Sequence, residues 1–308
     1  MRIRNRLIKC LALALVFTLL AGCPAYAKKK TTSFKSISSV MRGAVTAKTG
    51  RIYRRANTKS KVVKRLPFST KVRTLKERGR WYYVSYKKGR KNYRGYMLKT
   101  QLVKYNRKKK HIALTFDDGP SIYTTHIVLD ALEKNGCRAT FFLVGRKVNE
   151  ETRDLVLREK ALGCEFGNHT FSHVRLTTKV DVAWEFYQAD QAIKAVTGSR
   201  PVLCRSPFGA MRASTVKAMK RPHILWSFDT LDWKDQDTDV LRAKVRKNRR
   251  DGGIILMHDV YRPTVEGIDA ICQDLKKANY ETVTVTELAA IKGKKLKAGK
   301  TYWDMGKK

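Results

Sequence analysis

The chain has 308 residues, which is long enough for one large domain and a second, small one. Lys and Arg number 66 against 26 Asp and Glu, and the resulting formal net charge of +40 implies a polyanionic surface as partner. The six cysteines are widely spaced and include no CxxC pair, which excludes a disulfide-framework miniprotein and argues against a thiolate zinc site.

Residues 1–27 have the basic, apolar and cleavage regions of a secretory signal peptide. Their apolar run, residues 10–21, is shorter than the ~20 residues of a comfortable membrane span. Two cleavage sites compete. Ala25-Tyr26-Ala27 suits ordinary signal peptidase, whereas Leu20-Ala21-Gly22-Cys23 resembles a bacterial lipobox and would leave Cys23 lipidated. Both predict a protein outside the cytoplasm, either secreted and wall-associated or anchored as a lipoprotein through Cys23.

The positive charge is concentrated in the front part of the chain. Residues 28–110 hold 29 basic residues and one acid, Glu77, for a net charge of +28, whereas residues 111–308 have a net charge of +8. Residues 28–42 lack apolar periodicity and are rich in Lys, Ser and Thr, which predicts a basic tether.

Residues 43–105 alternate in short strands separated by turns such as Arg78-Gly79, which predicts a small all-β barrel. The strand from Gly79 to Val84, with Trp81-Tyr82-Tyr83, and the later Gly95-Tyr96 pair resemble a bacterial SH3-like domain. Residues 106–110 follow as a short charged linker.

Residues 111–292 alternate strands and helices, and residues 293–308 are predicted to form a basic tail. The strands are near-continuous apolar runs, which indicates an α/β domain with a mostly parallel sheet, open or closed into a barrel. We expect strands at 112–116, 139–144, 164–166, 202–204, 224–228 and 253–257. In such folds the site forms at the carboxyl ends of the strands.

Five short segments at or just after these strand ends carry the polar chemistry. Carboxylates and histidines are costly to bury unpaired, so their position after apolar strands indicates one shared site. The segments are residues 115–119 (TFDDG), 169–173 (HTFSH), 205–208 (RSPF), 229–233 (DTLDW) and 256–259 (LMHD).

Two of the segments indicate a metal site. Asp117 and Asp118 suit a general base beside a metal ligand, although Asp-Asp-Gly-Pro is also good turn chemistry. His169 and His173 are four residues apart, which predicts both on one face of a helical turn; such a pair alone is more often structural. Two histidines and one carboxylate with an open position form the ligand set of a catalytic zinc-type ion.

Together the five ordered segments resemble the motifs of the polysaccharide deacetylases, carbohydrate esterase family 4, over residues 110–290. The resemblance implies a distorted, often incomplete (β/α) barrel that removes acetyl groups from N-acetylated sugars or acetylated xylan. It also implies that Asp118, His169 and His173 hold a divalent ion, usually zinc. Asp117 would be the general base that takes a proton from the metal-bound water.

The resemblance implies roles for six further residues. Arg205 would hold Asp117 ionised, and the backbone N–H of Phe208 would stabilise the oxyanion. His258 would protonate the departing amine while Asp232 raises its pKa. Leu256 and Trp233 would wall the pocket for the acetyl methyl. Each role has a non-catalytic alternative. Arg205 could be a surface arginine and Trp233 an ordinary core aromatic, and His258 with Asp259 could be a structural pair.

A deacetylase outside the cytoplasm, with an SH3-like module and a basic front part, points to the bacterial cell wall. We expect it to deacetylate N-acetylglucosamine of peptidoglycan and to bind anionic wall polymers through its basic N-terminal half. A chitooligosaccharide deacetylase, an acetylxylan esterase and a non-catalytic wall-binding protein remain alternatives. Aromatic side chains on basic strands can stack on nucleic-acid bases, but the secretory signal argues against a nucleic acid as the partner.

Overall fold

The computed structural model describes residues 33–176, 180–209 and 212–306. The predicted signal peptide, with both cleavage sites and Cys23, lies outside the described residues. Within the three described ranges, no helix is both long and apolar enough to cross a membrane.

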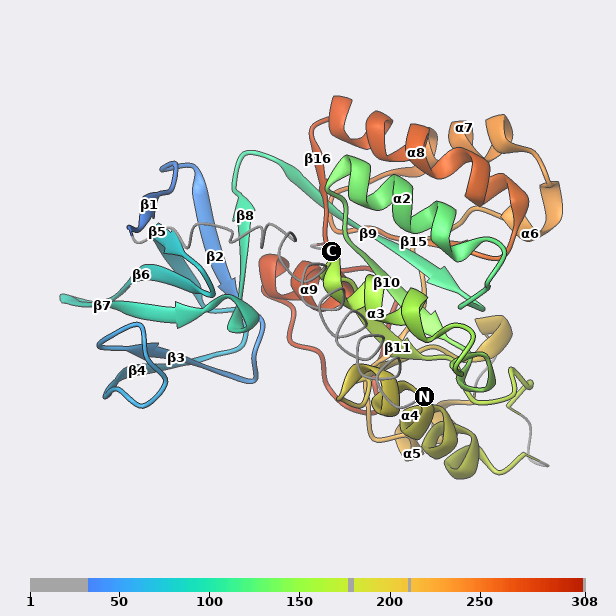
Figure 1. The fold of residues 1–308 in the computed structure, drawn as a ribbon, viewed down its shortest axis with the longest axis horizontal. Helices are drawn as coiled ribbons and strands as arrows, with labels where there is room; N and C mark the ends of the chain where they lie inside the picture. Colours follow the sequence, from blue (N-terminus) through green and yellow to red (C-terminus); the bar gives the residue numbers. More distant parts are fainter. Residues whose placement is uncertain (1–32, 177–179, 210–211, 307–308) are drawn as a thin grey trace, which may run out of the picture. The chain divides into compact units, whose positions relative to one another are not determined.

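The N-terminal part, residues 35–106, is all-β, as the alternating pattern predicts (Figure 1). Its sheet is antiparallel and runs β4-β3-β7-β6-β5-β2-β8, with β1 paired to β5. Inward-facing residues such as Ile52, Val84 and Met97 form its core. The SH3-like assignment stays a prediction. The strands are β1 (Lys35–Ser36), β2 (Met41–Val45), β3 (Thr49–Tyr53), β4 (Val62–Pro67), β5 (Lys71–Arg78), β6 (Trp81–Lys88), β7 (Lys91–Leu98) and β8 (Leu102–Asn106).

The second part is a parallel sheet that curls into an incomplete (β/α) barrel, as the family resemblance implies. Its order is β14-β15-β9-β10-β11-β12-β13-β17, with β16 also paired to β9, and no pairing between β14 and β17 closes it within the described residues. The strands are β9 (Lys110–Asp117), β10 (Ala139–Leu143), β11 (Glu165–Asn168), β12 (Leu203–Cys204), β13 (His223–Ile224), β14 (Phe228–Asp229), β15 (Ile254–His258), β16 (Tyr280–Thr282) and β17 (Thr301–Tyr302).

Helices cover the sheet, and α2, α7 and α8 lie side by side over β9 and β15 (Figure 1). Gly136 ends α2 in the left-handed conformation, which glycine adopts without steric cost. The helices are α2 (Thr125–Asn135), α3 (Arg153–Ala161), α4 (Val182–Thr197), α5 (Ala213–Ala218), α6 (Asp232–Asp235), α7 (Thr238–Asn248), α8 (Arg262–Lys277) and α9 (Val285–Lys292).

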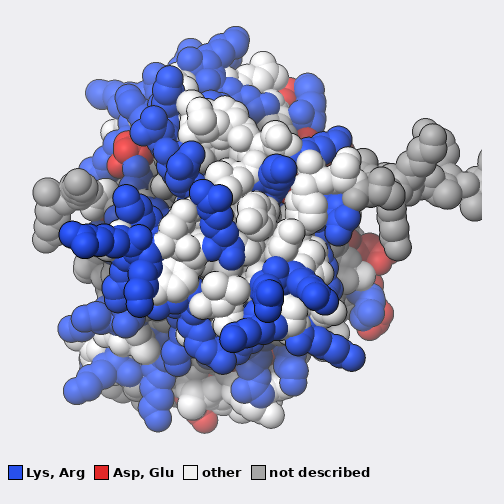
Figure 2. Space-filling model, turned by 90° about the vertical axis from the view of Figure 1, so that its left-hand side faces the viewer, with Lys and Arg blue, Asp and Glu red and all other residues white. Residues whose placement is uncertain are grey.

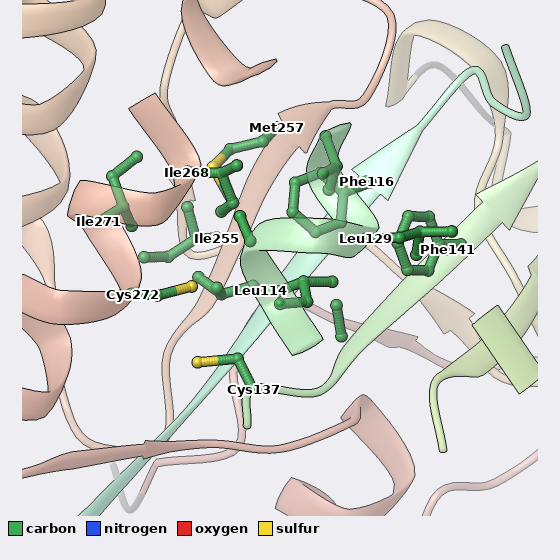
Figure 3. Close-up of a cluster of buried hydrophobic side chains, with 14 of the residues drawn as sticks. Leu114, Phe116, Leu129, Cys137, Phe141, Ile255, Met257, Ile268, Ile271 and Cys272 are labelled. Atoms are coloured by element: carbon green, nitrogen blue, oxygen red, sulfur yellow. The ribbon is translucent and has the colours of Figure 1, made fainter. Parts of the chain in front are cut away.

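The core of the second part lies between the sheet and α2 and α8 (Figure 3). Leu114, Phe116 and Phe141 of the sheet are fully buried, and the two phenylalanine rings stack with centroids 5.0 Å apart. Helices cover the strands, which explains their near-continuous apolar sequences. The four described cysteines are free; Cys137 and Cys272 are buried in this cluster as small apolar residues.

Several boundaries differ from the sequence-based ones; the expected linker at 106–110, for example, gives Asn106 to β8 and Lys110 to β9. Residues 224–228, expected as one strand, are split between β13 and β14. The carbonyls of Ile224 and Leu225 instead accept hydrogen bonds from the Arg205 side chain. In the segment expected as a tail, β17 pairs with β13, and in the segment expected as a tether, β1 pairs with β5.

Candidate active site

The ends of adjacent strands bring the predicted residues together. Asp117 is the last residue of β9 and His258 the last of β15, and the two lie opposite each other in the parallel register. His169 directly follows β11, and Arg205 directly follows β12. Parallel strands end at one edge of the sheet, so four sequence-distant segments meet there.

Asp118, His169 and His173 form a cluster whose ligand atoms all lie within 4.8 Å of one another. The Nε2 atoms of His169 and His173 lie 3.3 and 3.0 Å from Oδ1 of Asp118. That oxygen is buried and has no hydrogen-bond donor. Nδ1 of His169 faces the Arg205 carbonyl at 2.9 Å and donates to it, which leaves Nε2 with a free lone pair. An acceptor-only cluster of this composition fits a divalent cation.

The prediction that His169 and His173 share a face of a helical turn was wrong. Residues 169–176 form an irregular loop, in which Thr170 and His173 have φ values of 66° and 57°. Glu185 of α4 holds this loop by accepting the backbone N–H groups of Phe171 and Ser172 at 2.8 and 2.9 Å. Backbone torsion and tertiary hydrogen bonds therefore make the two imidazoles converge.

Arg205 and Asp117 form a buried ion pair next to the cluster of Asp118, His169 and His173. Nη1 of Arg205 donates to Oδ1 of Asp117 at 2.6 Å and to Oγ1 of Thr115 at 2.9 Å. The arginine is fully buried, and its remaining donors reach two backbone carbonyls. Burial lowers the pKa of Arg205, and the carboxylate of Asp117 opposes that shift. Each of the three guanidinium nitrogens thus donates a hydrogen bond, as a buried charge requires.

His258 and Asp232 form a second pair on the other side of Asp117. Nδ1 of His258 lies 2.8 Å from Oδ1 of Asp232, and Oδ2 accepts from the His258 backbone N–H at 2.8 Å and from Thr264 Oγ1 at 2.5 Å. Burial disfavours the imidazolium, but the hydrogen bond and charge of Asp232, with the charges of Asp117 and Asp118, raise the pKa of His258 to about 9. At neutral pH the His258 ring is therefore the positively charged imidazolium.

A cavity of about 410 Å³ opens over these groups. Eight of the ten predicted site residues line it, and Arg205 and Asp232 are buried behind it. The rings of Phe208 and Trp233 stay about half exposed at its wall. Phe208 has a φ of 60°, an uncommon value for a bulky residue that is often found at functional sites.

Several residues beyond the ten predicted ones belong to the site in the structure. Thr115 and Thr264 bind Arg205 and Asp232, and Arg175, Trp226 and Tyr261 line the cavity. Thr115 belongs to the predicted segment 115–119, but the sequence does not show that its hydroxyl faces Arg205. The other four lie outside the five segments and carry no signal in one sequence.

The family model described as polysaccharide deacetylase matches residues 104–224. A solved family 4 acetyl xylan esterase from Clostridium thermocellum, in complex with a cobalt ion, is 32% identical with a TM-score of 0.61. The likeness covers 63% of this chain and 98% of that one.

The chain belongs to the polysaccharide deacetylase family.

Two curated relatives within the polysaccharide deacetylases are named for peptidoglycan. The peptidoglycan-N-acetylglucosamine deacetylase PgdA of Listeria monocytogenes is 39% identical over 63% of this chain and 41% of its own length. The peptidoglycan-N-acetylmuramic acid deacetylase PdaC of Bacillus subtilis is 37% identical over 60% of this chain and 40% of its own length. The chain thus spans about two fifths of the length of these relatives.

Proposed function

We propose that this polysaccharide deacetylase hydrolyses the acetamide of N-acetylated amino sugars in peptidoglycan, with N-acetylglucosamine as the sugar. The observation that carries the proposal is the position of Asp117. It is held by Arg205, lies opposite a protonated His258 in the strand register, and adjoins a cluster that fits a divalent ion. The names of the two curated relatives support peptidoglycan as the substrate.

Asp118, His169 and His173 are the residues that would hold the ion, and zinc is the metal we expect from two imidazoles and one carboxylate. Such an ion, when bound, acidifies water and polarises the acetyl carbonyl. The related esterase was solved in complex with a cobalt ion, which supports a divalent metal as the cofactor.

Asp117 and His258 handle the protons of the reaction. Asp117 accepts a proton from the attacking water, and the oxygen of that water bonds to the acetyl carbon. Arg205 donates a charge-assisted hydrogen bond to Asp117 and fixes the direction of its carboxylate. The C–N bond then breaks, acetate leaves, and His258 donates its proton to the sugar nitrogen while Asp232 stabilises the imidazolium. The backbone N–H of Phe208 stabilises the oxyanion, and Leu256 and Trp233 enclose the acetyl methyl.

The all-β part supports a partner of opposite charge. Figure 2 shows many Lys and Arg side chains spread over one face, among uncharged residues and with few acidic ones. On the all-β part, Arg42, Lys71, Arg73 and Lys87 line one hollow of about 290 Å³. We infer that anionic wall polymers bind this basic surface, outside the cytoplasm, after the N-terminal signal directs export.

The test is zinc-dependent acetate release from purified muropeptides by the full chain. Chitooligosaccharide and acetylated xylan form parallel arms, because they separate the two alternative activities from the proposed one. Asp117→Asn is expected to abolish release. Equal release by Asp117→Asn and wild type would instead favour a non-catalytic wall-binding protein.

A further inference from the structure

One cationic side chain of the cavity has no part in the proposed chemistry. Arg175 lies in the loop after β11 and lines the cavity together with the metal-type cluster. Its guanidinium carbon lies 4.8 Å from the centroid of the Phe208 ring. The Phe208 ring in turn contacts the His173 ring, with centroids 4.9 Å apart. Arg175 is thus one aromatic ring away from a residue that would hold the metal.

The charge of Arg175 is unpaired within the described part of the chain. Its guanidinium makes no hydrogen bond or ion pair there, in contrast to Arg205, whose three guanidinium nitrogens all donate hydrogen bonds. Among the described cavity residues, Arg175 is also the one Lys or Arg. The cavity therefore presents one exposed guanidinium whose donors are free for a ligand.

A guanidinium that lies over an aromatic ring has fewer orientations open to it before any ligand arrives. Its N–H donors then form a fork that matches the two oxygens of a carboxylate. A neutral acetamido sugar offers no such group. Peptidoglycan does, because the peptide stems carry carboxylates, and the lactyl group of muramic acid carries one where no peptide is attached.

We propose that Arg175 forms a carboxylate-binding subsite, which selects glycans that bear an acidic substituent next to the reacting acetamido sugar. The proposal rests on the proposed deacetylase function for its substrate class. It assigns Arg175 to substrate recognition, and it predicts that the preference lies in binding and therefore in KM rather than in kcat.

The experiment measures binding and turnover for three tetrasaccharides with the zinc-loaded full chain. The first alternates N-acetylglucosamine with muramic acid that has free lactyl carboxyls, the second is the same glycan with these carboxyls amidated, and the third is chitotetraose. Calorimetry gives Kd, and acetate release gives kcat and KM. The variants are Arg175→Gln, Arg175→Lys and, as a matched control, Arg200→Gln, because Arg200 also lies over an exposed ring, that of Tyr187, but does not line the cavity.

We expect wild type to bind the carboxylate glycan about tenfold more tightly than the amidated one, as a charge-assisted pair predicts. Arg175→Gln should remove this preference for the carboxylate glycan by raising its KM, while the KM for chitotetraose stays within about twofold of wild type. Arg175→Lys should keep part of the preference. A ratio near one in wild type, or an equal loss on all three glycans in Arg175→Gln, would overturn the subsite. If no glycan releases acetate, the proposed deacetylase function fails, and the Kd ratio alone still decides the role of Arg175.

Discussion

Arg205 donates to Asp117 across 2.6 Å, and both side chains are buried. The pair joins β12 to β9, two strands separated by β10 and β11 in the sheet. Arg205 thereby fixes the position of the proposed base, Asp117, from the end of a strand that is not its neighbour in the sheet. A buried ion pair of this kind adds little net stability, but removal of one partner leaves an uncompensated charge.

Arg205→Met is therefore expected to lower the free energy of unfolding by about 3–5 kcal/mol, measured by urea unfolding. The exposed Arg153→Met is the control and should change it by less than about 0.5 kcal/mol. Addition of Asp117→Asn to Arg205→Met should recover part of the loss, because the orphaned charge is then gone. Strict additivity of the two substitutions would contradict the coupling.

Asp232→Asn is expected to move the alkaline limb of the pH–activity profile to lower pH. His258 acts in its protonated form, so activity falls as pH rises through its pKa, which the native site raises to about 9. Without the Asp232 charge that pKa falls, by about 1 unit or more. The control is Asp235→Asn on the same helix, whose carboxylate pairs with Lys244. An unchanged alkaline limb in Asp232→Asn would refute the role of His258 as acid.

The same pair also predicts a pH dependence of stability. The folded-state pKa of His258 lies above its ordinary value of 6.5, so the pair stabilises the fold fully below that pH and loses the contribution as pH rises to about 9. Urea unfolding of wild type and Asp232→Asn between these pH values should therefore converge toward the alkaline end. A constant difference in unfolding free energy would show that Asp232 acts by packing alone.

One zinc ion per chain is expected to bind at Asp118, His169 and His173. His169→Ala or His173→Ala should weaken zinc binding at least about 100-fold in competition with a chromophoric chelator. His126→Ala on the exposed surface of α2 is the matched control and should leave binding unchanged. Zinc should also raise the melting temperature of wild type by mass action and not that of His169→Ala. Wild-type affinity in His169→Ala would place the ion elsewhere.

Gly119→Ala is expected to weaken zinc binding and to lower the unfolding free energy by about 1–3 kcal/mol. A Cβ at this position would overlap the buried carboxylate of Asp259, and the chain next to Asp118 would have to move. Asp259→Ala removes the obstructing carboxylate, so the double variant should regain zinc affinity relative to Gly119→Ala. No difference between them would mean that the overlap is relieved in another way.

Wall binding is expected to weaken in about 0.5 M salt, because screening shortens the reach of surface charges. Arg73→Glu with Lys87→Glu, in the basic hollow of the all-β part, should lower cosedimentation with purified walls. Lys247→Glu with Lys277→Glu, on α7 and α8, makes the same change in net charge and serves as control. Equal effects of the two pairs would leave net charge, and not this surface, as the cause.

Chain order and hydrophobic pattern alone predict the all-β part, the alternation of strands and helices, and the strand ends that carry Asp117, His169, Arg205 and His258. These predictions succeed because a buried parallel strand requires an apolar run, and a polar residue is tolerated where that run ends. The ten predicted site residues come together for the same reason, since parallel strands end at a common edge.

The tertiary structure decided how those side chains face one another. The convergence of His169 and His173 depends on positive φ values and on Glu185, which lies twelve residues beyond His173 on another element. The break between β13 and β14 depends on carbonyls that a distant arginine occupies. The place of Arg175 over Phe208 has no local cause at all. Hydrogen bonds and ring contacts between residues far apart in the chain have no periodicity, so one sequence read locally cannot reveal them.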